Sequence, residues 1–215
     1  MNSVLVIGLG RFGRHLAVKC IEEGCDVLAV EMDEERANAA VTMIPNIEIA
    51  DMRDENVVSS MGVGNFDVCV IAVGDDFQTV LEMLVQLKDF GAKFVVARAT
   101  REVHEKLLLR NGADQVVYAE RDVAERLAVH LSYDHVYDYV KLNDEIGIYE
   151  ISVPDRWVGR SILELSIRAK HNVSVLAIRE GRSLQQALDP NHRFSASERL
   201  LVMGEEADVL RLVPN

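Results

Sequence analysis

The sequence predicts an α/β protein in which a Rossmann-like, doubly wound parallel sheet is followed by a second, smaller α+β C-terminal domain. Three observations lead to this fold class. An apolar run, Val4–Ile7, leads directly into the glycine-rich sequence Gly8-Leu-Gly10-Arg-Phe-Gly13. Short apolar runs then alternate with amphipathic stretches over about two thirds of the chain, as in βαβ units. After about residue 140 the alternation changes and no glycine motif recurs, which indicates a different module.

The glycine-rich sequence is typical of a strand, a tight turn and a helix start that together hold a phosphate. Gly8 permits the tight turn, Gly10 lets the backbone approach a phosphate, and Gly13 lets the helix pack against the strand. Glu31 ends the next apolar run, at the place where a carboxylate would meet a ribose. The motif predicts nucleotide binding, and the alternative is a turn of the same shape without a ligand.

The first domain is expected to contain parallel strands separated by amphipathic helices. The run Val68–Val73 is apolar at every position, which is typical of a strand covered on both faces. The expected strands are Val4–Ile7, Val27–Val30, Ile47–Ala50, Val68–Val73, Phe94–Ala97 and Gln115–Tyr118. Glycines that favour left-handed helix ends follow the predicted helices at Gly24, Gly62, Gly91 and Gly112.

A further helix is predicted over Glu120–Ser132, and the segment from Ser132 to Asp138 is the expected boundary. We therefore assign residues 1–133 to the first domain and 134–215 to the second. The second domain is expected to hold strands at Tyr137–Leu142, Ile148–Val153, Val173–Ile178 and Leu200–Met203, with helices at Ser161–Lys170 and Glu205–Leu212.

Composition narrows the possible partners and location. The net charge of −12 argues against a nucleic-acid-binding surface, which needs clustered Lys and Arg. The three cysteines lie in apolar segments, which favours buried thiols in a reducing cytosol. No apolar run approaches the ~20 residues that span a bilayer. A cytoplasmic protein is expected, and any role at a membrane would depend on a partner.

The residues favour some nucleotides over others. Nothing basic stands at Met32 or Asp33 to hold a 2′-phosphate, so NADP is disfavoured, whereas NAD, ATP, ADP and AMP all present the ribose diol that Glu31 could bind. Arg11 lies inside the glycine turn and could grip a terminal phosphate, which favours ATP or ADP. The alternative for Arg11 is an exposed side chain on the first helical turn.

Other candidate ligand-binding residues follow the later strands, because small molecules bind outside the carboxyl ends of the strands in such sheets. These candidates are Asp51, Met52, Val73, Gly74, Asp75, Arg98 and Glu120, and Asp51 could accept a hydrogen bond from an adenine amine. Catalysis has little support, since no GxSxG, HExxH or P-loop signature occurs and neither His171 nor His192 has an evident carboxylate partner. We expect a binding protein. The alternatives are a small NAD-dependent oxidoreductase and a redox-sensing regulator.

Several of these segments together resemble the RCK family, the regulators of potassium conductance. They are Val-Ile-Gly-Leu-Gly-Arg-Phe-Gly at 6–13, Leu28-Ala-Val-Glu-Met-Asp33, Asn65-Phe-Asp67 with Val70-Ile-Ala-Val-Gly74, Asn111-Gly-Ala-Asp114 with Glu120-Arg-Asp122, and Ser166-Ile-Arg-Ala-Lys170 with Val175-Leu-Ala-Ile-Arg179. The resemblance implies a cytosolic gating subunit of a Ktr- or Trk-type potassium uptake system. It also implies a homo-oligomeric ring, often an octamer, that contacts a separate membrane channel subunit at the inner face of the membrane and responds to ATP and ADP, or to NAD and NADH.

The resemblance also implies roles for individual residues. Arg11, beside Phe12, would reach the γ-phosphate and Glu31 the ribose, while Asp51 and Met52 would lie by the adenine. Arg98 would approach the phosphates, and Glu120 would lie near the γ-phosphate across a subunit interface, through a divalent cation such as Mg²⁺ or Ca²⁺. A second ligand, cyclic di-AMP, would bind the C-terminal lobe at Ile162, Ile167, Arg168, Ala169 and Asn172.

Overall fold

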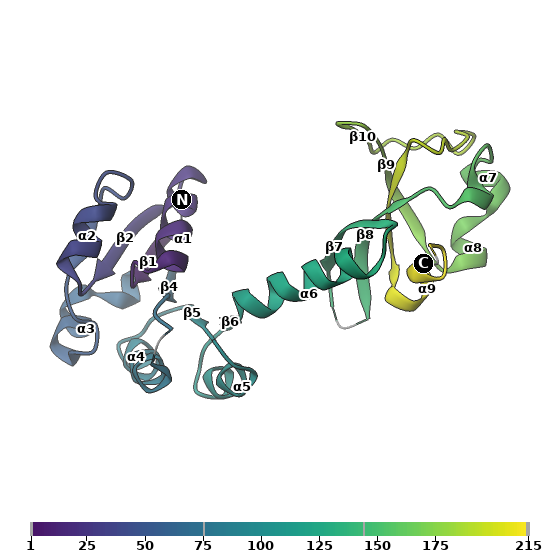
Figure 1. Ribbon diagram of the computed structural model, residues 1–215. Coiled ribbons are helices and arrows are strands. Elements are labelled where there is room, and N and C mark those ends of the chain that lie inside the picture. Colours follow the sequence, from purple (N-terminus) through teal and green to yellow (C-terminus); the bar gives the residue numbers. More distant parts are fainter. Residues whose placement is uncertain (1, 75, 144, 214–215) are drawn as a thin grey trace. The chain divides into compact units, whose positions relative to one another are not determined.

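The computed structural model describes residues 2–74, 76–143 and 145–213 and divides into two compact units, residues 1–120 and 121–215 (Figure 1). Each unit has hydrophobic core clusters of its own, so each can be understood as a separate packing body. Among the described residues, no helix combines the length and the hydropathy needed to cross a lipid bilayer.

The described residues of the first unit form a parallel six-stranded sheet with the strand order β3-β2-β1-β4-β5-β6. Its strands are β1 (Ser3–Ile7), β2 (Asp26–Glu31), β3 (Ile47–Ile49), β4 (Val68–Ile71), β5 (Val95–Arg98) and β6 (Gln115–Val117). The chain order reverses between β1 and β4, and in doubly wound sheets ligands bind at this switch point, outside the carboxyl ends of the strands. The predicted Rossmann-like fold is confirmed.

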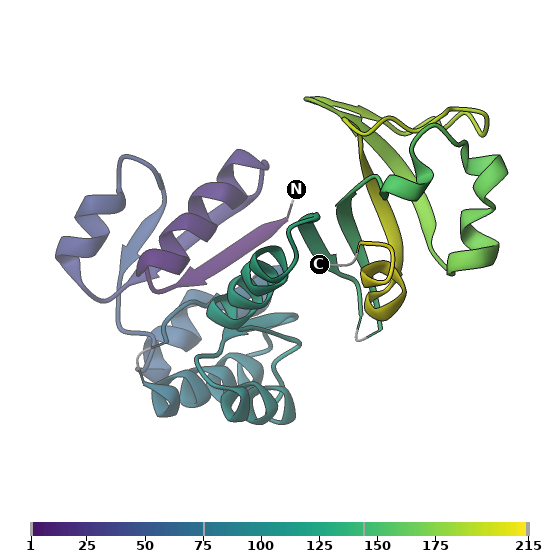
Figure 2. The same cartoon turned by 45° about the vertical axis from the view of Figure 1, so that its right-hand side comes forward.

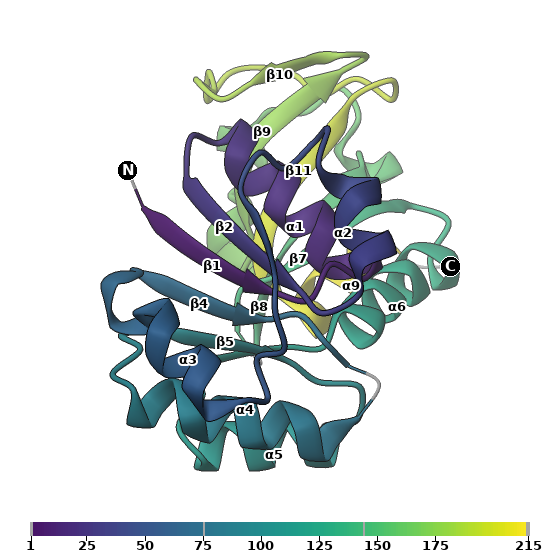
Figure 3. The same ribbon diagram turned by 90° about the vertical axis from the view of Figure 1, so that its left-hand side faces the viewer.

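Helices cover both faces of this sheet (Figure 3). They are α1 (Arg11–Glu22), α2 (Glu34–Ala40), α3 (Glu55–Met61), α4 (Phe77–Asp89) and α5 (Glu102–Arg110), with a 3₁₀ turn at Val63–Asn65. Successive residues of β1 point to opposite faces: Val4 and Val6 pack with α1 and α2, whereas Leu5 and Ile7 pack with α3, α4 and α5. Because both faces are covered, β1 is apolar at every position from Val4 to Ile7, as predicted.

Local signals set the ends of these helices. The carboxylates of Asp33, Asp54 and Asp76 accept hydrogen bonds from backbone N–H groups in the first turns of α2, α3 and α4. The four glycines predicted to end helices all have positive φ, between 64° and 103°. In contrast, the N-cap residue of α1 is Gly10, which has no side chain to cap the helix. The first amides of α1 therefore have no side-chain acceptor at their cap position.

The three cysteines differ in their burial. Cys69, on β4, is fully buried, and burial raises the pKa of its thiol to about 11. Cys20 and Cys25 are only half-buried and pack against the core beneath α1. None of the three, all within the described residues, forms a disulfide. The expectation of buried thiols therefore holds fully for Cys69 alone.

The described part of the second unit contains an antiparallel five-stranded sheet with the order β10-β9-β11-β8-β7 (Figure 2). Its elements are α6 (Ala119–Ser132), β7 (Val136–Lys141), β8 (Ile146–Ser152), a 3₁₀ turn (Asp155–Trp157), α7 (Ile162–Leu165), α8 (Ile167–His171), β9 (Ser174–Glu180), β10 (Ser183–Gln185), β11 (Arg199–Glu205) and α9 (Glu206–Leu210). The largest buried side chains of its core are Trp157, Tyr149 and Phe194. The predicted second α+β domain is confirmed.

Helix α6 spans the point where the chain divides. The sequence pattern predicts the whole helix as part of the first domain, which is expected to end at residue 133. In the structure Val129 and Tyr133 pack against the core of the second unit, and the division falls after Glu120. The apolar residues near the end of α6 therefore determine which unit the helix joins.

Two local features of the second unit differ from expectation. The helix predicted over Ser161–Lys170 is broken into α7 and α8 at Ser166, which has a left-handed φ of 49°. Strand β10 was not predicted, because its residues are all exposed and form no apolar run. It pairs with β9 at the edge of the sheet.

His192 has the carboxylate partner that its sequence context did not reveal. Its Nε2 lies 2.8 Å from Oε1 of Glu198, and Oε2 of the same carboxylate accepts a hydrogen bond of 2.8 Å from the backbone N–H of Ser195. Glu198 is buried, so these contacts satisfy a carboxylate that would otherwise be costly to desolvate. The pair holds the loop that precedes β11.

Candidate nucleotide-binding site

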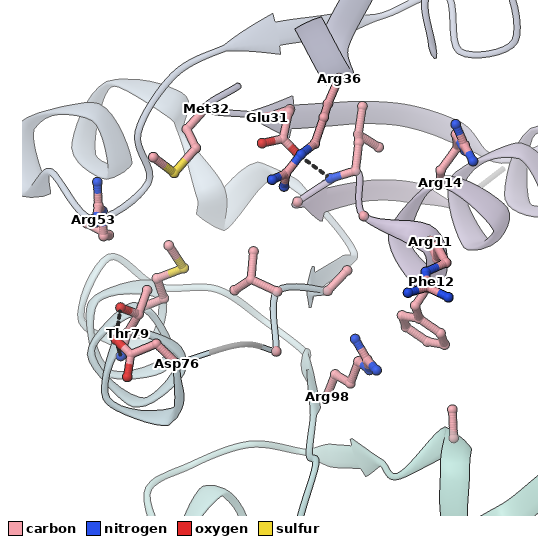
Figure 4. A pocket seen from close by; sticks show the side chains of 18 of the residues that line it. Arg11, Phe12, Arg14, Glu31, Met32, Arg36, Arg53, Asp76, Thr79 and Arg98 are labelled. Atoms are coloured by element: carbon pink, nitrogen blue, oxygen red, sulfur yellow. Dashed lines mark hydrogen bonds between the residues drawn. The ribbon is translucent and has the colours of Figure 1, made fainter. Parts of the chain in front are cut away.

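A cavity of about 810 Å³ opens at the carboxyl ends of β1, β2, β4 and β5 (Figure 4). This is the switch point of the sheet, and the volume is within the usual range for a small-molecule site. Its lining comes from the first unit: Gly8, Leu9, Gly10, Arg11, Phe12, Arg14, Glu31, Met32, Arg36, Arg53, Ala72, Val73, Gly74, Asp76, Thr79, Met83, Arg98, Ala119 and Glu120. The structure thus brings most of the sequence-predicted residues to one place.

The three motif glycines have different surroundings. Gly8 has a φ of +93°, and a Cβ on it would lie 2.5 Å from Cγ1 of Val73. A Cβ on Gly13 would lie 1.9 Å from the carbonyl oxygen of Gly8 and 2.9 Å from Cβ of Ala72. The predicted structural tasks of Gly8 and Gly13 are confirmed, although Gly13 packs beneath the turn and does not line the cavity. A Cβ on Gly10 would meet nothing within 4 Å, so this backbone faces open space.

The start of α1 forms one end of the cavity. Arg11, Phe12 and Arg14 line it from the first turn of this helix. Figure 4 shows Arg11 and Phe12 next to each other, with the side chain of Arg98 extending toward them. The Cζ of Arg98 is 5.8 Å from the centre of the Phe12 ring. The uncapped backbone amides of α1 and the guanidinium groups of Arg11, Arg14 and Arg98 line this end of the cavity, and such groups bind a phosphate chain.

Glu31 lines the cavity but is only 3% exposed. Its Oε2 accepts a hydrogen bond of 2.7 Å from the backbone N–H of Leu9, inside the glycine turn. Its Oε1 accepts one of 3.0 Å from the backbone N–H of Asp33. The carboxylate therefore ties the glycine turn to the turn after β2. The predicted ribose contact stays a prediction, and it would use the remaining acceptor capacity of these two oxygens.

Asp51 and Met52 do not line the cavity, although the sequence placed them beside the adenine. Met52 is 2% exposed and belongs to the core. The carboxylate of Asp51 is held by Arg53, with 2.9 Å from Nε to Oδ1 and 2.6 Å from Nη2 to Oδ2. These hydrogen bonds hold the pKa of Asp51 below its usual value. Arg53, which the sequence analysis did not select, is the residue of this loop that reaches the cavity.

Arg98 and Glu120 face each other across the cavity wall as an ion pair between Nη2 and Oε1. A hydrogen bond from its own backbone N–H at the start of α6 is the largest influence lowering the pKa of Glu120, and Arg98 adds to it. The buried Nε of Arg98 has no hydrogen-bond partner. Val73 and Gly74 complete this side, as the sequence predicted, and Asp75, the third candidate of this strand end, lies outside the described residues.

Several lining residues were missed because they lie on helices or loops that no motif marks. They are Arg14 on α1, Arg36 on α2, Arg53 after β3, Asp76 and Thr79 at the start of α4, and Met83 in the middle of α4. Arg36 could have been found, since it stands on the first turn of the helix that follows Glu31. The two positions after Glu31 carry no basic residue, but in the folded site Arg36 brings a guanidinium group to the same cavity.

The charge of the lining is opposite to that of the chain. Its arginines are Arg11, Arg14, Arg36, Arg53 and Arg98, and its acids are Glu31, Asp76 and Glu120. Five positive groups against three negative ones give a net charge of +2, in a chain whose net charge is −12. Arg53 is paired with Asp51 and Arg36 with Asp33, two carboxylates outside the lining, and Arg98 is paired with Glu120. The positive field of the cavity is therefore concentrated beside Arg11 and Arg14, at the start of α1. The arrangement suits a polyanion such as a nucleoside polyphosphate or a dinucleotide.

The residues suggested for a metal and for a second ligand lie in different settings. No group of three or more potential ligands among His, Cys, Asp and Glu gathers anywhere in the described residues, and Glu120 is engaged by Arg98. Ile162 and Ile167, proposed for a second ligand, pack in or against the core of the second unit. Arg168, Ala169 and Asn172 are exposed. The Nδ2 of Asn172 donates to Asp208 over 3.0 Å.

Two family models and several curated proteins match most of the chain. Residues 4–119 match the TrkA-N domain and residues 147–214 match the TrkA-C domain. Ktr system potassium uptake protein C of Bacillus subtilis (strain 168) is 34% identical over 206 residues, which are 96% of this chain and 93% of that protein. Ktr system potassium uptake protein A of the same organism is 31% identical, with the same coverage.

Comparison with solved structures supports the same fold. The GsuK channel has a TM-score of 0.74 and 17% sequence identity, and the match covers 100% of this chain and 40% of that chain. The crystal structure of the GsuK RCK domain has a TM-score of 0.67 at 17% identity, covering 100% of this chain and 48% of that one. The GsuK channel bound to NAD has a TM-score of 0.70 at 17% identity, and the match covers 100% of this chain and 40% of that chain.

Proposed function

Since this chain belongs to the RCK family, with a TrkA-N domain followed by a TrkA-C domain, we propose that it is a nucleotide-sensing regulatory subunit of a potassium uptake system. Its partner would be a separate membrane subunit that conducts potassium, and the protein would act in the cytoplasm at the inner face of the membrane. The closely related Ktr proteins are named as potassium uptake proteins, which favours a regulator and not an enzyme.

The observation that carries the ligand assignment is the cation-rich cavity over the glycine turn. Its lining charge of +2 contrasts with the acidic chain, and the backbone at Gly10 faces open space. We assign ATP and ADP as the ligands, with Arg11 at the γ-phosphate and Arg98 near the phosphate chain. NAD or NADH is the alternative, because it presents the same adenosine and pyrophosphate, and the structurally similar GsuK channel has been solved with NAD.

The coupling from ligand to partner would work by population shift. Arg98 is paired with Glu120, and Glu120 is in the first turn of α6, the helix that leads into the second unit. A phosphate chain that recruits Arg98 would compete with Glu120 and change the surroundings of this helix. A ligand shifts the balance between two states only by its differential affinity for them, so ATP and ADP must contact the two states differently.

Assembly would extend this site. We propose a homo-oligomeric ring, an octamer in its complete form, in which Glu120 of one subunit reaches the γ-phosphate held by its neighbour through a bound Mg²⁺ or Ca²⁺. Such a cation would draw ligands from the phosphates, since Glu120 supplies only one carboxylate. Cyclic di-AMP is proposed as a second ligand at the exposed ends of α7 and α8, with Arg168 and Asn172 as its polar contacts.

Calorimetric titration of the purified, nucleotide-stripped protein with ATP, ADP, NADH and cyclic di-AMP tests the ligand assignment. Tight binding of ATP and ADP with weak binding of NADH is expected. Preferential binding of NADH would instead favour the NAD-sensing alternative, and the absence of binding by all three nucleotides would refute the proposed function. Co-purification of the full-length protein with a membrane subunit that conducts potassium tests the partner.

A further inference from the structure

We infer that Arg53, held by Asp51, is the platform on which the purine base of the bound nucleotide stacks. This inference rests on the proposed function, since it names a base-binding residue of the same cavity. It assigns to Asp51 the role of a positioning residue, in place of the direct adenine contact that the sequence suggested.

The guanidinium of Arg53 is fixed along one edge. Its Nε lies 2.9 Å from Oδ1 and 3.1 Å from Oδ2 of Asp51, and its Nη2 lies 2.6 Å from Oδ2. The backbone N–H of Arg53 donates to Oδ1 of the same carboxylate over 3.0 Å. Because these hydrogen bonds hold the planar guanidinium of Arg53 along one edge, the side chain keeps one orientation. It therefore has little rotamer freedom left to lose when a ligand binds.

The loop that carries this pair is anchored on both sides. Met52 is buried in the core, and the next residue but one, Asp54, caps α3. The carbonyl oxygen of Arg53 accepts a hydrogen bond of 3.4 Å from Nε2 of Gln86 on α4. The guanidinium therefore extends from a constrained backbone, which a surface arginine on a free loop would lack.

Arg53 lies at the end of the cavity away from the phosphate-binding groups. Figure 4 shows Arg53 and Met32 on one side and Arg11, Phe12 and Arg98 on the other. Asp51 is not part of the lining, so the carboxylate backs the guanidinium from outside the cavity. A nucleotide whose phosphates lie over the start of α1 would place its base toward Arg53.

The chemistry of this end suits a flat aromatic base more than a phosphate. Asp51 neutralises much of the charge of Arg53 and occupies the Nε–Nη2 edge that would grip an anion. This pairing leaves open the face of the guanidinium, which attracts the π face of a base, and the N–H groups of Nη1. Met32, which is 58% exposed, and Met83 add polarizable surface to the same lining. Recognition by stacking favours the larger purines over pyrimidines.

The test compares ADP and CDP binding by calorimetry in the full-length protein and in Arg53→Ala, Arg53→Lys and Asp51→Asn, with Arg110→Ala as an arginine control outside the cavity. Arg53→Ala should weaken ADP about three- to thirty-fold, the range of a partly desolvated cation–π contact, and should reduce the preference for ADP over CDP. Arg53→Lys keeps the charge but lacks the plane, so it should lose nearly as much. The ADP affinity of Asp51→Asn should lie between those of the parent protein and Arg53→Ala. Arg110→Ala should bind ADP with the affinity of the parent protein.

Two results would overturn the inference. Unchanged ADP affinity in Arg53→Ala would show that the base lies elsewhere. Full affinity in Arg53→Lys would show that only charge matters at this position, as for a phosphate contact. Neither result affects the proposed function, which fails separately if the parent protein binds no ATP, ADP or NADH.

Discussion

Alanine substitutions at Gly13 and Gly10 should separate folding from ligand binding within one motif. At Gly13 the new Cβ would lie 1.9 Å from the carbonyl oxygen of Gly8. Real Cβ atoms essentially never approach another heavy atom within 3.0 Å. The two atoms would have to separate by 1.1 Å (3.0 − 1.9), and the Cβ of Ala72, at 2.9 Å from the new Cβ, is also closer than such contacts allow. Gly8 cannot easily give way, because its φ of +93° is already confined to glycine geometry.

The expected cost at Gly13 is at the upper end of what overpacking produces, about 3 kcal/mol. For a chain of this size that corresponds to a fall in Tm of about 6–12 °C. At Gly10, in contrast, φ is −59° and ψ is −175°, which alanine adopts, and nothing lies within 4 Å of the new methyl group. Its cost should stay below about 1 kcal/mol, while ADP affinity should fall at least about tenfold because the methyl group enters the phosphate path.

The loss of stability is measured by thermal unfolding followed by circular dichroism, without nucleotide and at equal protomer concentration. The loss of ADP affinity is measured by calorimetry. A Tm for Gly13→Ala within about 2 °C of the parent protein would refute the packing argument. Normal ADP binding by a folded Gly10→Ala variant would refute the assignment of the phosphate path.

Three further predictions concern other parts of the chain. Arg11→Ala should weaken ATP more than ADP, because only ATP carries the γ-phosphate; equal losses in calorimetry would contradict that placement. Cys69, with its pKa raised to about 11 by burial, should react with a thiol reagent at mildly alkaline pH only after unfolding, so a native titration should find two thiols of three. Burial, with Arg156 and Lys170 nearby, lowers the pKa of His171 below 6.5, so the folded state binds a proton less readily than the unfolded state. The stability that this adds is complete above about pH 6.5 and is lost as the pH falls through the lowered value, and His171→Gln should flatten the acid side of the Tm profile.

Much of the fold could be predicted because its signals are local. Val4–Ile7 is buried on both faces and is apolar throughout, so the run alone identifies a central parallel strand. Glycines such as Gly62 mark helix ends because only glycine takes positive φ at low cost. In the second unit, Ser166 takes a left-handed conformation with no glycine to signal it, and one helix was predicted where two occur.

The site could be predicted only where sequence neighbours stay neighbours in space. The glycine turn and Glu31 belong to one βαβ unit, so their approach follows from the motif. The loop after β3 is different: a topological rule selects Asp51 and Met52 as its first residues but cannot say which side chain turns inward. Packing buries Met52 and leaves Arg53 at the cavity, an outcome set by tertiary contacts with α3 and α4.

The position of the only tryptophan gives the protein an intrinsic reporter. Trp157 is 1% exposed in the core of the second unit, and the candidate nucleotide cavity is lined entirely by residues 8–120 of the first. Its emission therefore responds to events in a unit that the nucleotide does not occupy. A change in that emission when ADP is replaced by ATP would be a label-free record of a signal passed along the chain from one unit to the other.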